Sequence, residues 1–338
     1  MALERSKLGN AGPEITRLGL GAWAIGGGEW DFGWGPQDDQ DSIDTIKRGV
    51  EFGLSWVDTA AAYGLGHGEE VVGRAVRDLP EDERPWVFTK NGMHWEEGDR
   101  SVQRLWDPAL LKQQCEDSLR RLGVERIDLL QIHWPGTDDA SAEEAWGAMA
   151  ELVDQGKVRW IGVSNFGVDL LERCEAIRHV DSVQPPLSLI DRRAAADVIP
   201  WAEEHGTGVI VYSPMHSGLL SGRFSRERVE QLDETDHRKK RPEFNEPELS
   251  NNLALAERLT QLADRLECSL PELAVAWTLA VPGVTGAIVG ARRPDQIDGW
   301  IGAGDVRLDD EALEEIASIV QDTGAGDGPA ALPRRRLA

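Results

Sequence analysis

Long apolar runs are missing from this sequence of 338 residues. No stretch approaches the roughly 18 consecutive apolar residues of a membrane-spanning helix. The opening residues, Met1 to Lys7, hold no apolar segment behind a basic one, so we expect neither a signal peptide nor a membrane span. Cysteine is also scarce. Cys115, Cys174 and Cys268 are isolated and odd in number, which favours free thiols in a reducing cytoplasm.

Positive charge is in short supply as well. Thirty-six Lys and Arg residues face 60 Asp and Glu residues, which gives a formal net charge of -24. A surface of that sign repels nucleic acid and anionic membranes, and we expect neither as a partner. The seven histidines show no zinc-protease spacing, and no Walker lysine motif is present, so we predict no metal site.

What the sequence does contain is a regular alternation of short apolar strands and amphipathic helices. A small hairpin around Asn10–Pro13 precedes it, and hydrophobic residues make up 41% of the chain. Eight strands separated by helices predict an α/β fold, a closed (β/α)8 TIM barrel with active residues at the carboxyl ends of its strands. A doubly wound sheet is the alternative, and the short eighth strand counts against it. The expected strands are 17–23, 55–57, 86–90, 127–133, 158–163, 182–184, 208–214 and 286–290, and the expected helices are 42–52, 69–77, 110–122, 141–154, 170–177, 195–205, 253–266 and 271–279.

A glycine motif near the start of the chain is a decoy. Residues Gly19 to Ala24 match the G-x-G-x-x-A form of the dinucleotide fingerprint. That fingerprint binds a pyrophosphate only where it opens a helix within a βαβ unit. Here a glycine-rich and aromatic loop follows instead, so we expect no phosphate site at this position.

Side chains that can carry chemistry follow three successive expected strands. Asp58 stands at the end of the second strand, and Tyr63 follows five positions later in a small, glycine-rich loop. Lys90 ends the third strand, and His133 ends the fourth. Strand ends of a parallel barrel meet on one face, so we expect these four side chains to converge there.

The four residue types suit the reduction of a carbonyl group. The reaction needs hydride at carbon and a proton at oxygen, and free tyrosine, with a pKa of about 10, is a weak acid for that task. A neighbouring ammonium such as Lys90 would lower the pKa of Tyr63. Asp58 would hold Lys90 charged and oriented, and His133 would donate a hydrogen bond to the carbonyl oxygen. Each residue alone has an ordinary structural explanation, whereas the joint pattern favours catalysis.

This set, in this order, resembles the aldo-keto reductases, and in particular the branch related to potassium-channel β subunits and bacterial stress-type enzymes. The resemblance implies one barrel domain over residues 1–322 and NADPH-dependent, reversible reduction of small-molecule aldehydes or ketones. It also implies that Tyr63 is the general acid. A cofactor-sensing regulatory subunit with slow turnover is the alternative function. Residues 323–338 are rich in Gly, Ala and Pro and predict a flexible C-terminal tail.

The second half of the chain carries the cofactor motifs of the same family. By resemblance, residues at the ends of strands five to seven bind the nicotinamide carboxamide and stack a tyrosine on it, and a following glycine-rich loop covers the pyrophosphate. Serine and asparagine suit an amide because both donate and accept hydrogen bonds. The full set that we expect to contact the cofactor is Gly21, Trp23, Ser164, Asn165, Gln184, Tyr212, Ser213, Pro214, Met215, Ser217, Gly218, Leu219, Gly222, Gly290, Ala291, Arg292 and Gln296.

The adenosine end of the cofactor is where the resemblance is weakest. The better-known branch has Lys-Ser at Gly290-Ala291 and an arginine at Gln296. We expect Arg292 to bind a 2′-phosphate, because a planar guanidinium makes parallel hydrogen bonds to phosphate oxygens and a chain of net charge -24 needs a local cation for such a ligand. NADPH is therefore the expected cofactor, with a modest preference, and NADH remains possible.

Three long loops follow strands one, three and seven, at 26–39, 92–107 and 223–250. Loops of this length on the catalytic face are usually functional or disordered. We expect 223–250 to be mobile without cofactor and to become ordered over it. Candidates for the wall of the substrate pocket are Trp23, Trp30, Trp34, Trp95 and Trp134, which would favour apolar aldehydes or flat ketones.

Overall fold

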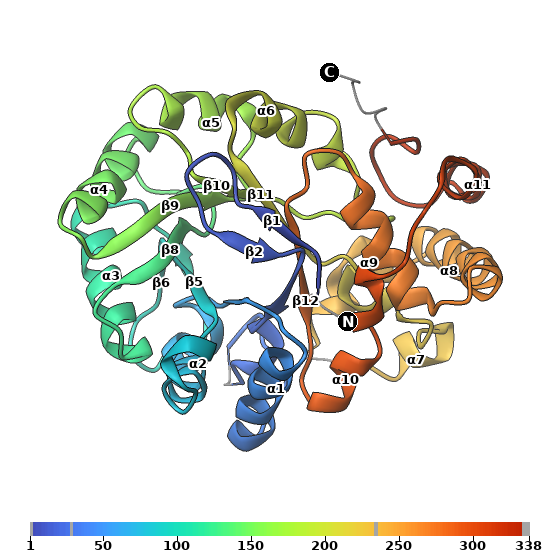
Figure 1. Cartoon of the computed structure of the whole chain (residues 1–338), viewed down its shortest axis with the longest axis horizontal. Coiled ribbons are helices and arrows are strands. Elements are labelled where there is room, and N and C mark those ends of the chain that lie inside the picture. Colours follow the sequence, from blue (N-terminus) through green and yellow to red (C-terminus); the bar gives the residue numbers. More distant parts are fainter. Residues whose placement is uncertain (1–2, 28–29, 233–235, 333–338) are drawn as a thin grey trace.

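Eight parallel strands form the centre of the fold (Figure 1). The computed structural model describes residues 3–27, 30–232 and 236–332. Each strand pairs with its neighbours in parallel, and the last strand pairs with the first, which closes the sheet. This confirms the TIM barrel and rules out the doubly wound sheet. The strands are β3 (Leu18–Gly21), β4 (Trp56–Asp58), β5 (Trp86–Asn91), β8 (Ile127–Ile132), β9 (Val158–Ser164), β10 (Ser182–Gln184), β11 (Gly208–Tyr212) and β12 (Gly286–Gly290).

Helices surround the barrel, and their ends follow local signals in the sequence. Ser141 and Glu144 form the expected capping box at the start of one helix, and Gly123 ends another in the left-handed conformation, with φ of 68°. The helices are α1 (Asp39–Glu51), α2 (His67–Arg77), α3 (Pro108–Leu122), α4 (Ala142–Asp154), α5 (Val168–Glu175), α6 (Val198–His205), α7 (Arg226–Glu230), α8 (Glu248–Arg265), α9 (Leu270–Ala280), α10 (Pro294–Asp298) and α11 (Asp310–Thr323).

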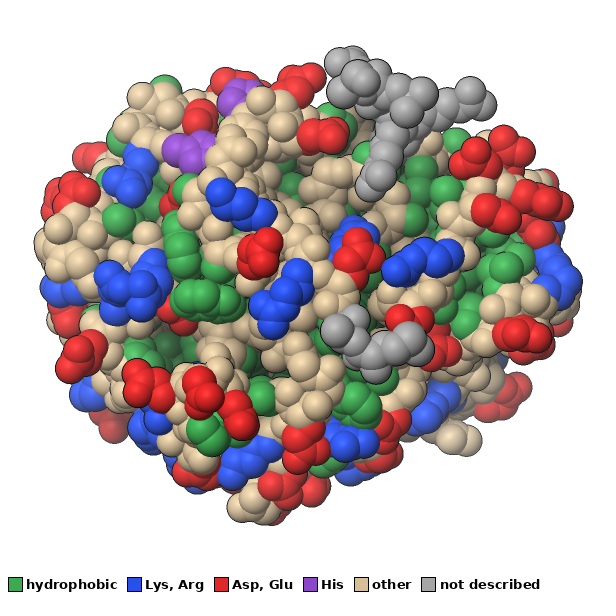
Figure 2. All heavy atoms as spheres, viewed as in Figure 1, with side chains coloured by type: hydrophobic (Ala, Val, Ile, Leu, Met, Phe, Trp, Pro, Cys, Tyr) green, Lys and Arg blue, Asp and Glu red, His purple; other side chains and the backbone are tan. Residues whose placement is uncertain are grey.

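The predicted N-terminal hairpin closes one end of the barrel. Its strands are β1 (Arg5–Lys7) and β2 (Glu14–Thr16), and Figure 1 looks directly onto them. Leu8 and Ile15 are buried against Trp56 and Phe88 of the barrel interior. Trp56 is the first residue of β4, at its amino end, so the hairpin covers the face opposite to the strand ends that carry Lys90. Acidic and basic side chains are interspersed over this covered face (Figure 2).

The glycine motif at Gly19 does not open a helix. Gly19 and Gly21 lie within β3, a 3-10 turn follows, and α1 begins only at Asp39. The absence of a side chain at Gly19 serves packing instead: a Cβ there would stand 2.1 Å from Cε2 of Trp56. Gly19 is therefore a packing feature of the barrel.

The long loops contain short elements of their own. The second loop holds a small hairpin of β6 (Met93–His94) and β7 (Gln103–Arg104). The third loop includes α7 and two 3-10 turns, and its residues 233–235 lie outside the described part. Whether it orders on cofactor binding stays a prediction. Among the described residues, no helix has the length and apolar content that crossing a membrane requires.

The stretch predicted as a flexible tail needs a correction. Helix α11 runs through Thr323, and Ala325 beyond it is buried. Arg192 is also buried and donates hydrogen bonds to the carbonyl oxygens of Ala325, Gly328 and Pro329, at 3.2, 3.4 and 3.1 Å. Residues 324–332 therefore pack on the barrel, because a guanidinium from a distant loop satisfies their main chain. Residues 333–338 lie outside the described residues.

Candidate active site

The four side chains predicted to act in catalysis lie together at the carboxyl ends of β4, β5 and β8. Nζ of Lys90 donates to Oδ1 of Asp58 at 2.5 Å and to the carbonyl oxygen of Thr59 at 2.9 Å. It also lies 3.4 Å from the hydroxyl of Tyr63. The rings of Tyr63 and His133 meet edge to face, with centroids 5.7 Å apart. Neighbouring parallel strands end at one edge of the sheet, which is why residues far apart in sequence meet here.

Lys90 and Asp58 form a buried ion pair. Their side chains are 0% and 3% exposed, and Nε2 of Gln184 donates to the second oxygen of Asp58 at 2.9 Å. Burial, the largest influence, raises the pKa of Asp58 and lowers the pKa of Lys90, whereas their attraction for each other acts in the opposite direction on both. Each group thus keeps its charge because the other is present. The ammonium of Lys90 makes three hydrogen bonds, to Asp58, Thr59 and Tyr63, which fix it next to the phenol.

The expected lowering of the Tyr63 pKa is not found in this structure. Burial, followed by the negative charge of Asp58, holds the pKa of Tyr63 well above its usual value of about 10. The contact with Lys90 is long, at 3.4 Å, and the ammonium is neutralised by the much closer carboxylate. The phenol is therefore protonated at neutral pH, which is the form that a proton donor needs.

His133 lies beside this phenol as a neutral imidazole. Burial, then the positive charges of Lys90 and Arg104, keep the pKa of His133 well below its usual value. Its Nδ1 is buried and has no hydrogen-bond partner among the described residues. A neutral ring has one N–H donor, so it can donate one hydrogen bond to an oxygen placed beside Tyr63.

The residues predicted to hold the carboxamide form one hydrogen-bonded chain at the ends of β9, β10 and β11. Oγ of Ser164 donates to the carbonyl of Gln184 at 2.9 Å, and Nδ2 of Asn165 donates to the carbonyl of His133 at 3.0 Å. The hydroxyl of Tyr212 donates to Oδ1 of Asn165 at 2.7 Å. This chain runs on through Gln184 to Asp58, so the predicted cofactor residues and the predicted catalytic residues share one network.

The glycine-rich loop after β11 has an unusual backbone. Left-handed conformations occur at Ser213, His216, Ser217, Gly218 and Gly222, with φ of 59°, 46°, 53°, 96° and 69°. Pro214 and Leu219 are buried and anchor it, whereas Met215 is half-buried. Three of these five positions are not glycine, and such strain persists only where surrounding contacts hold it.

One buried member of this loop was not anticipated. His216 lies with Nδ1 3.0 Å from Oγ of Ser188 and Nε2 3.4 Å from Oε1 of Glu243. It joins the loop after β10 to the third long loop. Both partners are more than 25 residues away in the sequence, so no local pattern pointed to it.

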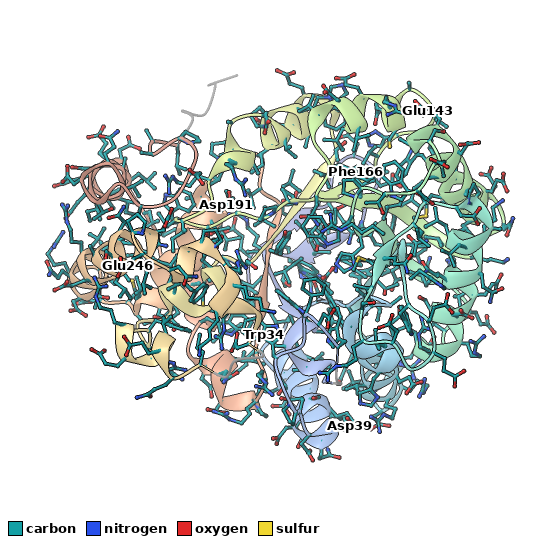
Figure 3. The ribbon with its side chains drawn as sticks, turned by 180° about the vertical axis from the view of Figure 1, so that it is seen from behind. Trp34, Asp39, Glu143, Phe166, Asp191 and Glu246 are labelled. Carbon is teal, nitrogen blue, oxygen red and sulfur yellow. The ribbon has the colours of Figure 1, made fainter. Side chains whose placement is uncertain are left out.

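The residues predicted for the adenosine end lie where β12 meets β3. Gly21 and Gly290 are register partners, Ala291 is buried, and the main-chain N–H of Arg292 donates to Oε1 of Gln296 at 2.7 Å. The guanidinium of Arg292 donates to the carbonyl oxygen of Trp34 in the first long loop, and Trp34 is labelled in Figure 3.

Three of the five candidate tryptophans lie in the apolar cluster that contains Tyr63, and a fourth contacts one of them. Trp23 stacks near Tyr63, with ring centroids 6.4 Å apart, and Trp30 lies at 6.2 Å. Trp134 packs in the same apolar cluster, and Trp34 meets Trp23 edge to face at 5.3 Å. Trp95 is half-buried, and no described contact joins it to this cluster.

A hollow of about 410 Å³ lies away from this site, outside the barrel, next to α1, α2 and α3. Several of its arginines are already paired, as Arg74 is with Asp39 and Arg121 is with Glu69. Its lining residues are Asp39, His67, Glu70, Arg74, Arg77, Arg120 and Arg121, none of which comes from a strand end.

A nicotinamide cofactor fits the residues at the strand ends. Ser164, Asn165 and Gln184 present hydroxyl and amide groups next to Asp58, and the unpartnered nitrogen of His133 lies in the same place. The described residues contain no group of three His, Cys, Asp or Glu side chains that could hold a metal ion. The three cysteines are unpaired.

Comparisons with known proteins by sequence and by structure point to the same family. The model of the aldo/keto reductase family matches residues 17–321. Aldo-keto reductase YhdN of Bacillus subtilis (strain 168) is 34% identical over 322 residues, which cover 95% of each protein. The NADH-specific methylglyoxal reductase of Escherichia coli (strain K12) is 31% identical and covers 94% of this chain and 100% of its own. The glycerol dehydrogenase AKR11B4 from Gluconobacter oxydans has a similar structure, with a TM-score of 0.86, 34% identity and coverage of 99% of this chain and 100% of its own.

Proposed function

Because this chain belongs to the aldo/keto reductase family, whose members reduce carbonyl groups with NAD(P)H, we propose that Tyr63 is its proton donor and that NADPH is its preferred cofactor. The observation that carries the catalytic assignment is the position of Lys90. Its ammonium is buried between the carboxylate of Asp58 and the hydroxyl of Tyr63. An ion pair that served only stability would not require the hydroxyl of Tyr63 next to the ammonium.

The chain's own groups account for the proton and the orientation of the substrate. The carbonyl oxygen is placed between the hydroxyl of Tyr63 and the imidazole of His133, where both donate to it. A bound nicotinamide cofactor supplies hydride to the carbonyl carbon. Tyr63 releases its proton to the oxygen as negative charge develops there, and the phenolate that remains is stabilised by the ammonium of Lys90. Asp58 keeps that ammonium charged and in place.

The wall of tryptophans supports apolar aldehydes or flat ketones as the substrate class. Trp23, Trp30 and Trp134 pack in the cluster that contains Tyr63. A carbonyl attached to an aromatic or aliphatic body would bury that body against these rings.

The free cysteines support a cytoplasmic location, which stays a proposal.

Arg292 supports the preference for NADPH. Among the described residues no carboxylate pairs with its guanidinium, so its charge is available to a phosphate. One relative is named as NADH-specific, so the affinities of this chain for NADPH and NADH have to be measured.

The test is a turnover assay with a panel of aldehydes and ketones, in which NADPH consumption is followed with purified protein. We expect kcat on the order of 1 s⁻¹ or more for the best substrate, within the ordinary range of enzymes. Tight cofactor binding with fewer than about one turnover per minute on every carbonyl would instead support a cofactor-sensing subunit.

A further inference from the structure

The first long loop is joined to the short segment between β12 and α10 by a reciprocal pair of residues, Gln37 and Arg292. Nε of Arg292 donates to Oε1 of Gln37 at 2.9 Å, and Nε2 of Gln37 donates to the carbonyl oxygen of Arg292 at 2.8 Å. The two other guanidinium nitrogens donate to the carbonyl oxygens of Trp34 at 3.0 Å and Pro36 at 2.5 Å. One arginine thus holds the loop by the side chain of Gln37 and by two main-chain carbonyl groups.

The residue held in this way lies where three loops meet. The ring of Trp34 lies under the guanidinium of Arg238, 5.0 Å from the ring centroid, and Arg238 belongs to the third long loop. On another side Trp34 meets Trp23 edge to face, with centroids 5.3 Å apart, and Trp23 stacks near Tyr63. A displacement of Trp34 would therefore move Trp23, which is the only ring between Trp34 and the proposed proton donor in this series of contacts.

We propose that Arg292 and Gln37 form a latch that positions Trp34, and that the latch sets how well the site accepts a flat aromatic carbonyl compound. The inference rests on the proposed function, because it names the part of the substrate pocket that discriminates between substrates. Gln37 is a positioning residue: it acts on the pocket through Arg292 and the loop that carries Trp34, and its Nε2 also donates to Oγ of Ser42 at 3.1 Å.

The guanidinium of Arg292 can hold the loop and bind a phosphate at the same time. Arginine has five N–H donors in a rigid plane, and three of them contact the loop, so two are left for a phosphate. Arg292 is half-buried and has Arg238 and Arg293 as charged neighbours. Carbonyl oxygens of the loop are therefore the groups that compensate its charge in this structure.

The decisive variant is Gln37→Ala. It removes one partner of the pair and leaves the proposed catalytic and cofactor residues in place. We expect KM for an aromatic aldehyde such as 4-nitrobenzaldehyde to rise about tenfold, the scale of a poorer fit in an apolar pocket. KM for propanal should change less than about twofold and kcat should be maintained, because a small substrate has little surface to place against Trp34. The variant Gln37→Glu keeps the acceptor for Nε of Arg292 but loses the donor to its carbonyl oxygen, so it should restore KM in part.

Gln40→Ala is the matched control. This glutamine lies three positions further on, and among the described residues its side chain bonds only to the exposed Asp44, at 2.8 Å. Its KM values should equal those of wild type. The proposal is overturned if Gln40→Ala reproduces the effect, if both substrates are affected equally by Gln37→Ala, or if neither is affected.

A second measurement is independent of turnover. Hydrogen exchange of the main-chain amides from Trp34 to Gln37 should become about tenfold faster in Gln37→Ala and stay unchanged in Gln40→Ala, since local opening reports the loss of local contacts. Unchanged exchange in Gln37→Ala would refute the latch. If wild type reduces no carbonyl at all, the proposed function fails, and the exchange experiment still decides whether the latch exists.

Discussion

Two regions of the catalytic face differ in what holds their side chains in place. At the ends of β4, β5 and β8, Asp58, Lys90 and His133 are fixed by the register of the barrel and are buried. Around Trp34, in contrast, the contacts come from loops, and Arg292 is 258 positions away in the sequence. Removal of a charge from the first region disturbs the core, whereas the second region can change with little cost to the barrel. In the proposed function, proton transfer and substrate choice therefore depend on separate parts of the structure.

The strongest challenge to the strand-end region is Lys90→Met. This change leaves the carboxylate of Asp58 buried without its cation, so the free energy of unfolding should fall by about 3–5 kcal/mol. Lys47→Met is the matched control, because Lys47 pairs with Asp78 at the surface at 3.0 Å and should contribute less than about 1 kcal/mol. Urea denaturation measures both. Equal stability of the two variants would show that the buried pair is not what holds this region.

Tyr63→Phe tests the chemistry of the same region without disturbing its packing. We expect kcat to fall at least about a hundredfold, the scale of general acid catalysis, with cofactor Kd nearly unchanged. The only other tyrosine, Tyr212, gives the contrast. Tyr212→Phe loses the bond to Asn165 and should change cofactor Kd more than kcat. Near-full carbonyl reduction by Tyr63→Phe would remove Tyr63 as the proton donor.

Arg292→Ala tests the loop region. Kd for NADPH should rise about ten- to a hundredfold, from the loss of one or two charged hydrogen bonds, and Kd for NADH should change much less. Arg293→Ala is the control, because Arg293 is exposed and bonds to Asp295. Binding of both cofactors is measured at fixed salt. The assignment fails if wild type binds NADH as tightly as NADPH, or if the substitution weakens both equally.

The smallest effect concerns pH. The pKa of Tyr63 is raised, so its proton is present at all pH values below that pKa and is lost only as pH rises through it. The pKa of His133 is lowered, so the imidazole is neutral from below its ordinary value of about 6.5 upward. We therefore expect kcat/KM for reduction to vary less than about twofold between roughly pH 6.5 and 9. A fall of tenfold within that range would mean that one of these groups titrates there.

The strand-end residues could be predicted from the sequence because strand periodicity and barrel closure determine where they lie. The pKa of Tyr63 could not be predicted, because depth of burial depends on the tryptophans that cover the ring. The contacts of Arg292 with Trp34 and Pro36 were also missed, since they join loops distant in sequence. The same holds for His216, and for Arg192, which packs residues 324–332 against the barrel.

The hairpin of β1 and β2 covers the face of the barrel opposite the proposed catalytic residues. Leu8 and Ile15 are buried there, and the described chain enters β1 on the same side (Figure 1). A protein attached to a solid support through its N-terminus would therefore stand with its catalytic mouth facing the solution. Immobilisation in that orientation should leave the entry of substrate unobstructed, which a tether on the opposite face would not.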